Sequence, residues 1–328
     1  MPPRGRPTRS AILARFDALR EDLDRLGGVP APDRADEAWD EIWRADVHHS
    51  TAIEGNTLSP REVAALLETG EAIGRHDLSE YVEVRAYADA AMWAYGQARS
   101  HADPWLSGEK LTLTEIREVH RQVVGPVWLM DPPPGLGTEE GPGAFRRNDI
   151  REFPSGMKPP PWTEVPHLMT DWVAVVAAPV PEGRHLLTSL AQLHAGFERI
   201  HPFRDGNGRV GRLLLNLLLV RHGHPPLVVR RQQRRRYLAA LARADRGDLG
   251  PLTELFARAA LDSLERFVLP AYASQADLLP LAALETDDLS RAALAQAVRR
   301  GRLRAVRRRG SSYSSRAWVD EYKASRRR

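Results

Sequence analysis

The chain has 328 residues, 42% of them hydrophobic and 27% charged, and a formal net charge of +4. It contains no cysteine, which excludes a disulfide framework and thiolate metal sites and is typical of a reducing cytosol. No apolar run reaches the ~18 residues of a membrane span, and no signal-peptide apolar core follows the basic start. These features predict a cytoplasmic protein with no membrane partner and with a substantial core.

Helical patterns dominate the first 124 residues. Residues 11–26 are amphipathic and charged, as in a surface helix. Residues 59–62 form a capping box with proline at the first helical position, and residues 78–97 and 112–124 are typical of further helices. These patterns predict a mainly α-helical fold.

A short polar segment precedes the capping box. It reads Ser50-Thr51-Ala52-Ile53-Glu54-Gly55-Asn56. Ser50 and Glu54 are four residues apart, so a helix places both side chains on the same side. Taken alone, a serine and a glutamate at this spacing usually belong to a solvated helix surface.

Residues 125–161 contain nine prolines and six glycines in 37 residues. This composition excludes a long helix there, and loops of this length are often functional.

A helix is predicted over residues 186–200. Its apolar residues recur at steps of four and three: Leu186, Leu190, Leu193, Phe197 and Ile200. His194 on this helix is interpreted as a hydrogen-bonded core histidine, because no cysteine and no evident third ligand accompany it.

The segment that follows is the most informative of the chain. It reads His201-Pro202-Phe203-Arg204-Asp205-Gly206-Asn207-Gly208-Arg209-Val210-Gly211-Arg212. His201 can accept a hydroxyl proton at neutral pH, and Asp205 offers a hard oxygen ligand for Mg²⁺. The apolar run over 213–220 predicts a buried helix, whose N-terminus exposes unpaired N–H groups.

The glycines, the amide and the arginines of this segment suit a polyphosphate. Gly206 and Gly208 permit positive φ and a close approach of the backbone. Asn207 can donate from its side-chain amide. Arg209 and Arg212 are three residues apart, so both guanidinium groups lie on one helix face. Together these residues predict an anion site.

The same segment matches the signature of the Fic family, His-x-Phe-x-Asp/Glu-Gly-Asn-Gly-Arg-x-x-Arg, at every defined position, and residues 193–200 resemble the usual approach to it. Fic proteins mostly transfer AMP from ATP to a hydroxyl side chain of a target protein. The resemblance therefore implies a Fic-fold helical domain, ATP and Mg²⁺ as cofactors, and an in-line displacement at the α-phosphorus, catalysed mainly by positioning and charge neutralisation.

The resemblance also implies a role for each motif residue. His201 is the general base, Phe203 anchors the loop, and Asp205 holds Mg²⁺. The residues implied to contact the phosphates are Gly206, Asn207, Gly208, Arg209 and Arg212, the last at the γ-phosphate.

Residues 50–56 fit the inhibitory motif of this family, Ser/Thr-x-x-x-Glu-Gly/Asn, with Ser50, Glu54 and Gly55 at its defined positions. In relatives, the glutamate pairs with the second arginine of the signature, which is Arg212 here. A carboxylate then competes with a phosphate for one guanidinium group, and ATP is held in an unproductive position.

Residues 143–150 resemble the β-hairpin flap with which Fic enzymes align the target peptide. The implied target-binding residues are Phe145, Arg146, Arg147 and Asn148. Pairing along a strand edge accepts many peptide sequences through main-chain hydrogen bonds. A plain surface loop is the alternative.

The last thirty residues are much more basic than the rest of the chain. Residues 299–328 carry twelve Arg or Lys and two Asp or Glu, a net charge of +10 that leaves −6 on the rest. A helix is predicted from 288–291 onward, then a turn into a strand over 301–306, a wing tip at 311–315 and a last helix containing Trp318, Val319 and Tyr322. This arrangement resembles the small winged helix-turn-helix of many bacterial Fic proteins and implies DNA or protein contact.

Three regions are thus expected: an N-terminal helical region with the inhibitory helix (1–110), a Fic catalytic core (111–270) and a basic winged helix (281–328). Three alternatives stay open besides AMP transfer: transfer of another nucleotide or a phosphoryl group, removal of AMP, and a DNA-binding regulator whose Fic body senses ATP. Gly208 argues against the kinase-like variant, which carries lysine there. Dimers are common in the family, so a homodimer stays open as well.

Overall fold

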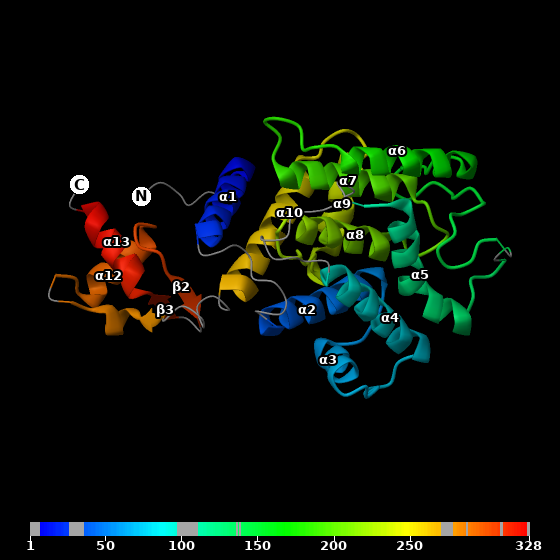
Figure 1. The fold of residues 1–328 in the computed structure, drawn as a ribbon. Coiled ribbons are helices and arrows are strands. Elements are labelled where there is room, and N and C mark those ends of the chain that lie inside the picture. The colour runs from blue at the N-terminus through cyan, green and yellow to red at the C-terminus, as the bar shows by residue number, and fades with distance from the viewer. Residues whose placement is uncertain are drawn as a thin grey trace.

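The computed structural model describes residues 7–25, 36–96, 111–135, 137, 139–269, 278–286, 288–308 and 311–326. Figure 1 shows a helical body, coloured blue to yellow, and a smaller C-terminal unit, coloured orange to red. The body is formed by α1 (Arg9–Arg25), α2 (Asp36–Glu54), α3 (Pro60–Glu68), α4 (Leu78–Tyr95), α5 (Leu113–Met130), α6 (Val165–Ala177), α7 (Leu186–Ile200), α8 (Asn207–Arg221), α9 (Arg234–Ala244) and α10 (Gly250–Ser263). The mainly α-helical prediction is confirmed.

Helix α8 lies at the centre of the body. Every residue from 213 to 220 is buried, as the apolar sequence predicts for a helix surrounded on all sides. Helices α2, α4, α5 and α7 pack around it. This position fixes the start of α8, where the signature segment lies, against four neighbouring helices.

One hydrophobic core spans the whole body, from Ile12 to Val268. Helix α4 packs on α5, and α1 packs on α10. The predicted boundary at residue 110 therefore does not separate two cores, because helices on either side of it bury the same apolar surface.

The described helices agree with the predicted patterns, with one difference. Helix α5 starts at a Thr112 capping box but continues past Gly125 to Met130, with Pro126 inside it. Val124 and Trp128 are both buried on this stretch, so packing outweighs the proline. The helix predicted over 112–124 thus runs six residues further than predicted, and no long helix lies within the described residues of 125–161. From Asp131 to Pro161 the described residues form no helix or strand.

The C-terminal unit has its own small core and sheet. It contains β1 (Leu279–Pro280), the 3₁₀ turn η5 (Leu281–Leu284), α12 (Arg291–Arg299), β2 (Val306–Arg308), β3 (Ser311–Ser314) and α13 (Arg316–Arg326). The strands are antiparallel in the order β1-β3-β2, with Val306 opposite Tyr313. Leu294 and Val319 anchor the core.

Two details of this unit differ from expectation. Ser290 caps α12, so the helix begins at Arg291, and residues 311–314 form a strand instead of a wing tip. The connection between β2 and β3 falls on residues 309–310, which lie outside the described residues. Across the described segments of the chain, no helix is long and apolar enough to cross a bilayer.

Candidate active site

The signature segment is a short connection between two helices with left-handed backbone at each end. Helix α7 ends at His201, whose φ is 50°, and α8 begins after Gly206, whose φ is 77°. A Cβ atom on Gly206 would lie 2.6 Å from Cγ1 of Val124. Position 206 therefore requires glycine for both its backbone conformation and its close packing.

Phe203 and Asn207 hold this loop together. Phe203 is fully buried and stacks on His120, with ring centroids 3.8 Å apart. The Asn207 side chain accepts from the Phe203 N–H at 2.9 Å and donates to the Phe203 carbonyl oxygen at 2.8 Å. The predicted anchoring by Phe203 fits this packing. Asn207 is buried and uses its side-chain oxygen and one amide N–H to close the loop, and its contact with phosphate stays a prediction.

His201 lies at the edge of a cavity with one ring nitrogen engaged. Its Nδ1 donates to the Glu198 carbonyl oxygen at 3.3 Å, which leaves Nε2 as the proton acceptor. Burial, together with the nearby Arg146 charge, lowers the pKa of His201 to about 4. The imidazole is therefore neutral at physiological pH, as a general base must be.

Asp205 and Arg209 form a second group at the start of α8. The Asp205 carboxylate is 58% exposed and accepts from Nη2 of Arg209 at 3.0 Å. Arg209 is buried and also donates to Glu83 of α4 at 2.5 Å. The arginine is thus oriented from behind by Glu83, a residue that no sequence pattern singled out.

Arg212 joins the signature helix to the predicted inhibitory segment. Its Nε donates to Ser50 Oγ at 2.8 Å, and its Nη2 donates to the Ser50 carbonyl oxygen at 2.9 Å and to Glu54 Oε1 at 2.8 Å. Ser50 and Glu54 lie one turn apart at the end of α2, which Gly55 terminates with a φ of 122°. A Cβ atom on Gly208 would collide with the Glu54 carboxylate.

These groups border a cavity of about 630 Å³. Its walls come from the ends of α2 and α7, the start of α8, one face of α9 and residues 153–157. The residues of this wall that sequence patterns did not assign to the site are Phe153, Pro154, Ser155, Met157, Glu198, Arg199, Arg234, Tyr237, Leu238, Ala239, Leu241, Ala242 and Asp245. Their positions in the sequence could not predict this, because they come together only when α9 and the long loop pack beside the signature segment.

The predicted flap residues lie beside this cavity but outside its wall. Arg146 is buried and donates to the His201 carbonyl oxygen at 2.8 Å, so it supports the base from behind. Phe145 packs against Phe203. Arg147 and Asn148 both donate to the buried Glu140, through a backbone N–H and a side-chain amide. The segment 143–150 forms no strand.

The part of the loop that faces His201 is instead residues 153–157. A turn closed by a hydrogen bond from the Phe153 N–H to the Met157 carbonyl oxygen, 2.9 Å long, places the Phe153 ring 5.0 Å from the His201 ring. Whether residues 145–148 contact a target stays a prediction.

Comparisons with known proteins agree with this geometry. Residues 110–219 match the Fic/DOC family. The chain is 33% identical over 244 residues to the protein adenylyltransferase Fic of Culex quinquefasciatus, covering 74% of this chain but only 45% of that protein. It thus spans less than half the length of that relative.

Solved structures show the same fold. Fic-1 (residues 134–508) of C. elegans is 27% identical, with a TM-score of 0.66 over 81% of this chain and 73% of that chain. A Fic family protein from Desulfovibrio desulfuricans G20 is 22% identical, with a TM-score of 0.56 over 96% of this chain and 98% of that chain, and shows the fold alone. Residues 110–219 therefore form a domain of the Fic/DOC family.

Proposed function

We propose that this protein transfers AMP from ATP to a Ser, Thr or Tyr hydroxyl of a target protein and that Glu54 inhibits the transfer. Relatives named protein adenylyltransferase Fic support the reaction class. The observation that carries the proposal is the convergence of a neutral base, His201, and a buried guanidinium, Arg212, on one cavity.

His201 accepts the proton in the proposed reaction. Its Nε2 takes the proton of the target hydroxyl while the hydroxyl oxygen forms a bond to the α-phosphorus of ATP. The bond between that phosphorus and the bridging oxygen to the β-phosphate breaks, and pyrophosphate leaves. The Nδ1–H donated to Glu198 holds the ring in the required tautomer and orientation.

The phosphates are bound by positive groups at the start of α8. Gly208 and Arg212 line the cavity at this end of the helix, where the first-turn N–H groups have no partner within the helix. Arg209 is buried one turn away and pairs with Asp205, the proposed Mg²⁺ ligand. Asp205 is an exposed carboxylate among these cations, which suits a Mg²⁺ ion that takes its other ligands from water and phosphate. When bound, Mg²⁺ neutralises phosphate charge.

Inhibition follows from the Glu54 contact. While its carboxylate accepts from Nη2 of Arg212, that N–H is withheld from the terminal phosphate, and the carboxylate repels the phosphate. Removing Glu54 frees that N–H of Nη2, while Ser50 continues to hold the guanidinium group in place.

Incubation of the purified chain with labelled ATP and Mg²⁺ tests the reaction. The Glu54→Gly variant is expected to add the mass of AMP to itself or to lysate proteins, and the Glu54→Gly/His201→Ala variant is expected to add none. Labelled UTP, GTP and CTP in parallel separate AMP transfer from transfer of another nucleotide. Absence of any nucleotide adduct with Glu54→Gly would sink the proposal.

The target peptide is proposed to lie along residues 153–157, beside His201. Phe153, Ser155 and Met157 line the cavity there, and Phe145 to Asn148 form the base of the same loop. An extended peptide bound by its main chain explains how a hydroxyl is presented without a strict sequence motif.

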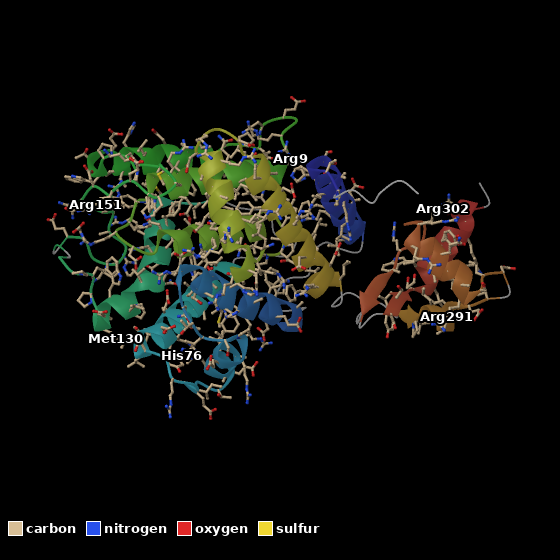
Figure 2. All side chains as sticks on the ribbon, turned by 180° about the vertical axis from the view of Figure 1, so that it is seen from behind. Arg9, His76, Met130, Arg151, Arg291 and Arg302 are labelled. Atoms are coloured by element: carbon tan, nitrogen blue, oxygen red, sulfur yellow. The ribbon has the colours of Figure 1, made fainter. Side chains whose placement is uncertain are left out.

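DNA binding by the C-terminal unit is a second candidate function. The strand order β1-β3-β2, with α12 just before β2, supports the predicted winged helix-turn-helix. Arg291, Gln296 and Arg299 are exposed on one face of α12, and Figure 2 labels Arg291 and Arg302 on this unit. A cationic exposed helix suits the phosphate backbone and a groove.

A mobility-shift titration of the full chain with duplex DNA tests this candidate. Binding is expected to weaken steeply with salt and to fall in Arg291→Ala/Arg299→Ala, because those side chains would contact phosphates. Binding that ignores both salt and these variants would contradict it.

A further inference from the structure

Glu198 is a buried carboxyl group of the cavity wall with no side-chain role in the proposed transfer. It lies on α7, one turn before His201, and its side chain is only 13% exposed. The exposed part borders the cavity that Glu54, His201 and Arg212 also border.

One oxygen of this carboxyl group, Oε1, is fully buried. It finds no hydrogen-bond partner among the residues that the structure describes. It lies beside the backbone of Gly211, where a Cβ atom would collide with it, and 3.8 Å from Nε2 of His194. That nitrogen already accepts from the Tyr237 hydroxyl at 2.6 Å, since Nδ1 of His194 donates to the Gly211 carbonyl oxygen.

The nearest cation is already engaged elsewhere. Arg212 acts on Glu198 electrostatically, but its Nε and Nη2 donate to Ser50 and Glu54. A buried polar group without a partner costs free energy, and such groups in folded proteins commonly have a functional explanation.

The surroundings of Glu198 favour its neutral form. Burial raises the pKa of Glu198 to about 8, Arg212 opposes the rise, and Glu54 and Asp245 add to it. At pH 7 the group is therefore a carboxylic acid, whose O–H is a hydrogen-bond donor. The O–H of Glu198 therefore needs a hydrogen-bond acceptor. An anion bound by the Arg212 guanidinium group would place such an acceptor beside it.

We propose that Glu198 donates the O–H of its other carboxyl oxygen, the one not enclosed by Gly211 and His194, to a phosphate oxygen of the nucleotide that Arg212 binds. The inference rests on the proposed nucleotide-binding function of this cavity. A hydrogen bond to a charged phosphate oxygen is stronger than one to a neutral acceptor. The ionised carboxylate would instead repel the phosphate, so binding requires the proton on Glu198.

ATP affinity measured by calorimetry from about pH 7 to about pH 9.5 tests the inference. In wild type, affinity is expected to fall above about pH 8, approaching tenfold per pH unit. Glu198→Gln is expected to keep the neutral-pH affinity and to lose the pH dependence, because its amide donates and does not titrate. Glu198→Ala is expected to bind weakly throughout.

Other groups around Glu198 do not produce this profile. The pKa values of His194 and His201 are lowered to about 3 and about 4 by burial, so both rings stay neutral over the range. Burial raises the pKa of Tyr237, and the Glu54 charge raises the pKa of Arg212, so neither loses its proton. Asp245→Asn alters another carboxyl group of the cavity wall but keeps Glu198, so it is the matched control. It should retain the fall in affinity, moved to somewhat lower pH, because the Asp245 charge also raises the pKa of Glu198.

A Glu54→Gly background sharpens the test. Since the Glu54 charge raises the pKa of Glu198, its removal should shift the fall in affinity to lower pH. Affinity that rises with pH, or that Glu198→Gln abolishes at every pH, would show that the carboxylate is needed and would overturn the inference. A flat wild-type profile would also overturn it.

The pH titration of ATP affinity and the AMP-transfer assay can succeed or fail independently. pH-dependent ATP binding without AMP transfer would sink the transferase and leave Glu198 as a phosphate ligand. AMP transfer with an ATP affinity that does not change with pH would support the transferase and overturn the role of Glu198. Circular dichroism at each pH confirms that the protein stays folded during the titration.

Discussion

The signature loop and the inhibitory helix meet at Arg212, but they are held by different kinds of contact. The loop is closed by buried hydrogen bonds between Asn207 and Phe203 and is supported by the buried Arg146. The Glu54 carboxylate is 36% exposed and reaches Arg212 from the last turn of α2. The signature loop is thus preformed, whereas the Glu54 contact lies where a ligand or partner can displace it.

The largest effect is expected from breaking the loop at Gly206. In Gly206→Val, the side chain would overlap Val124 and force the backbone out of its left-handed conformation. AMP transfer in the Glu54→Gly background should fall at least ~100-fold, since small displacements of the base are costly. Transfer within threefold of the parent, measured by radiolabel incorporation, would show that the loop tolerates a different path.

Asn207→Ala should weaken the same loop without adding bulk. It removes both hydrogen bonds to Phe203 and leaves that buried N–H and carbonyl group unpaired. We expect the free energy of unfolding to fall by about 3 kcal/mol in urea titrations. If stability were unchanged and only ATP affinity fell, Asn207 would be a direct phosphate ligand.

Ser50→Ala should weaken the contact between α2 and Arg212 slightly and leave the signature loop unchanged. The variant removes the Oγ acceptor but keeps the Ser50 carbonyl oxygen and Glu54 on Arg212. Basal AMP transfer is expected to rise about threefold. Steady-state rates at saturating ATP measure it, and activation equal to that of Glu54→Gly would place the main restraint on Ser50.

The smallest effect is expected from pH between about 5 and about 7.5, the range in which an ordinary histidine titrates. Because burial lowers the pKa of His201 to about 4, the base stays neutral over this range. Transfer by Glu54→Gly should therefore decline through His201 only as pH falls toward 4. A pH–rate profile with an acidic midpoint near 6.5 would contradict the buried environment of this ring.

Much of the site could be predicted from the sequence because its residues are adjacent. The signature lies within twelve residues, and the resemblance of residues 50–56 to a family motif, not the Ser50–Glu54 spacing alone, predicted the inhibitory turn. The contact of Glu54 with Arg212 crosses 158 positions, and it was reached through a resemblance and not through periodicity.

What the sequence could not show depends on three-dimensional packing. The amide of Asn207 satisfies its own loop, which its residue type alone does not reveal. Glu198 looked like any helical glutamate, because burial against Gly211 and α9 is invisible in a linear pattern. Helix α5 continues through Pro126 because Trp128 is buried, which local propensity does not anticipate.

The central claim is that Glu54 withholds Arg212 from ATP. AMP incorporation by wild type, Glu54→Gly and Glu68→Gly, measured side by side, tests it most directly. Glu68 is a matched control, since it also ends a helix and pairs with an arginine, Arg44, at 2.6 Å. Glu54→Gly should exceed wild type by roughly tenfold or more, with Glu68→Gly unchanged. Equal incorporation by wild type and Glu54→Gly would contradict the claim.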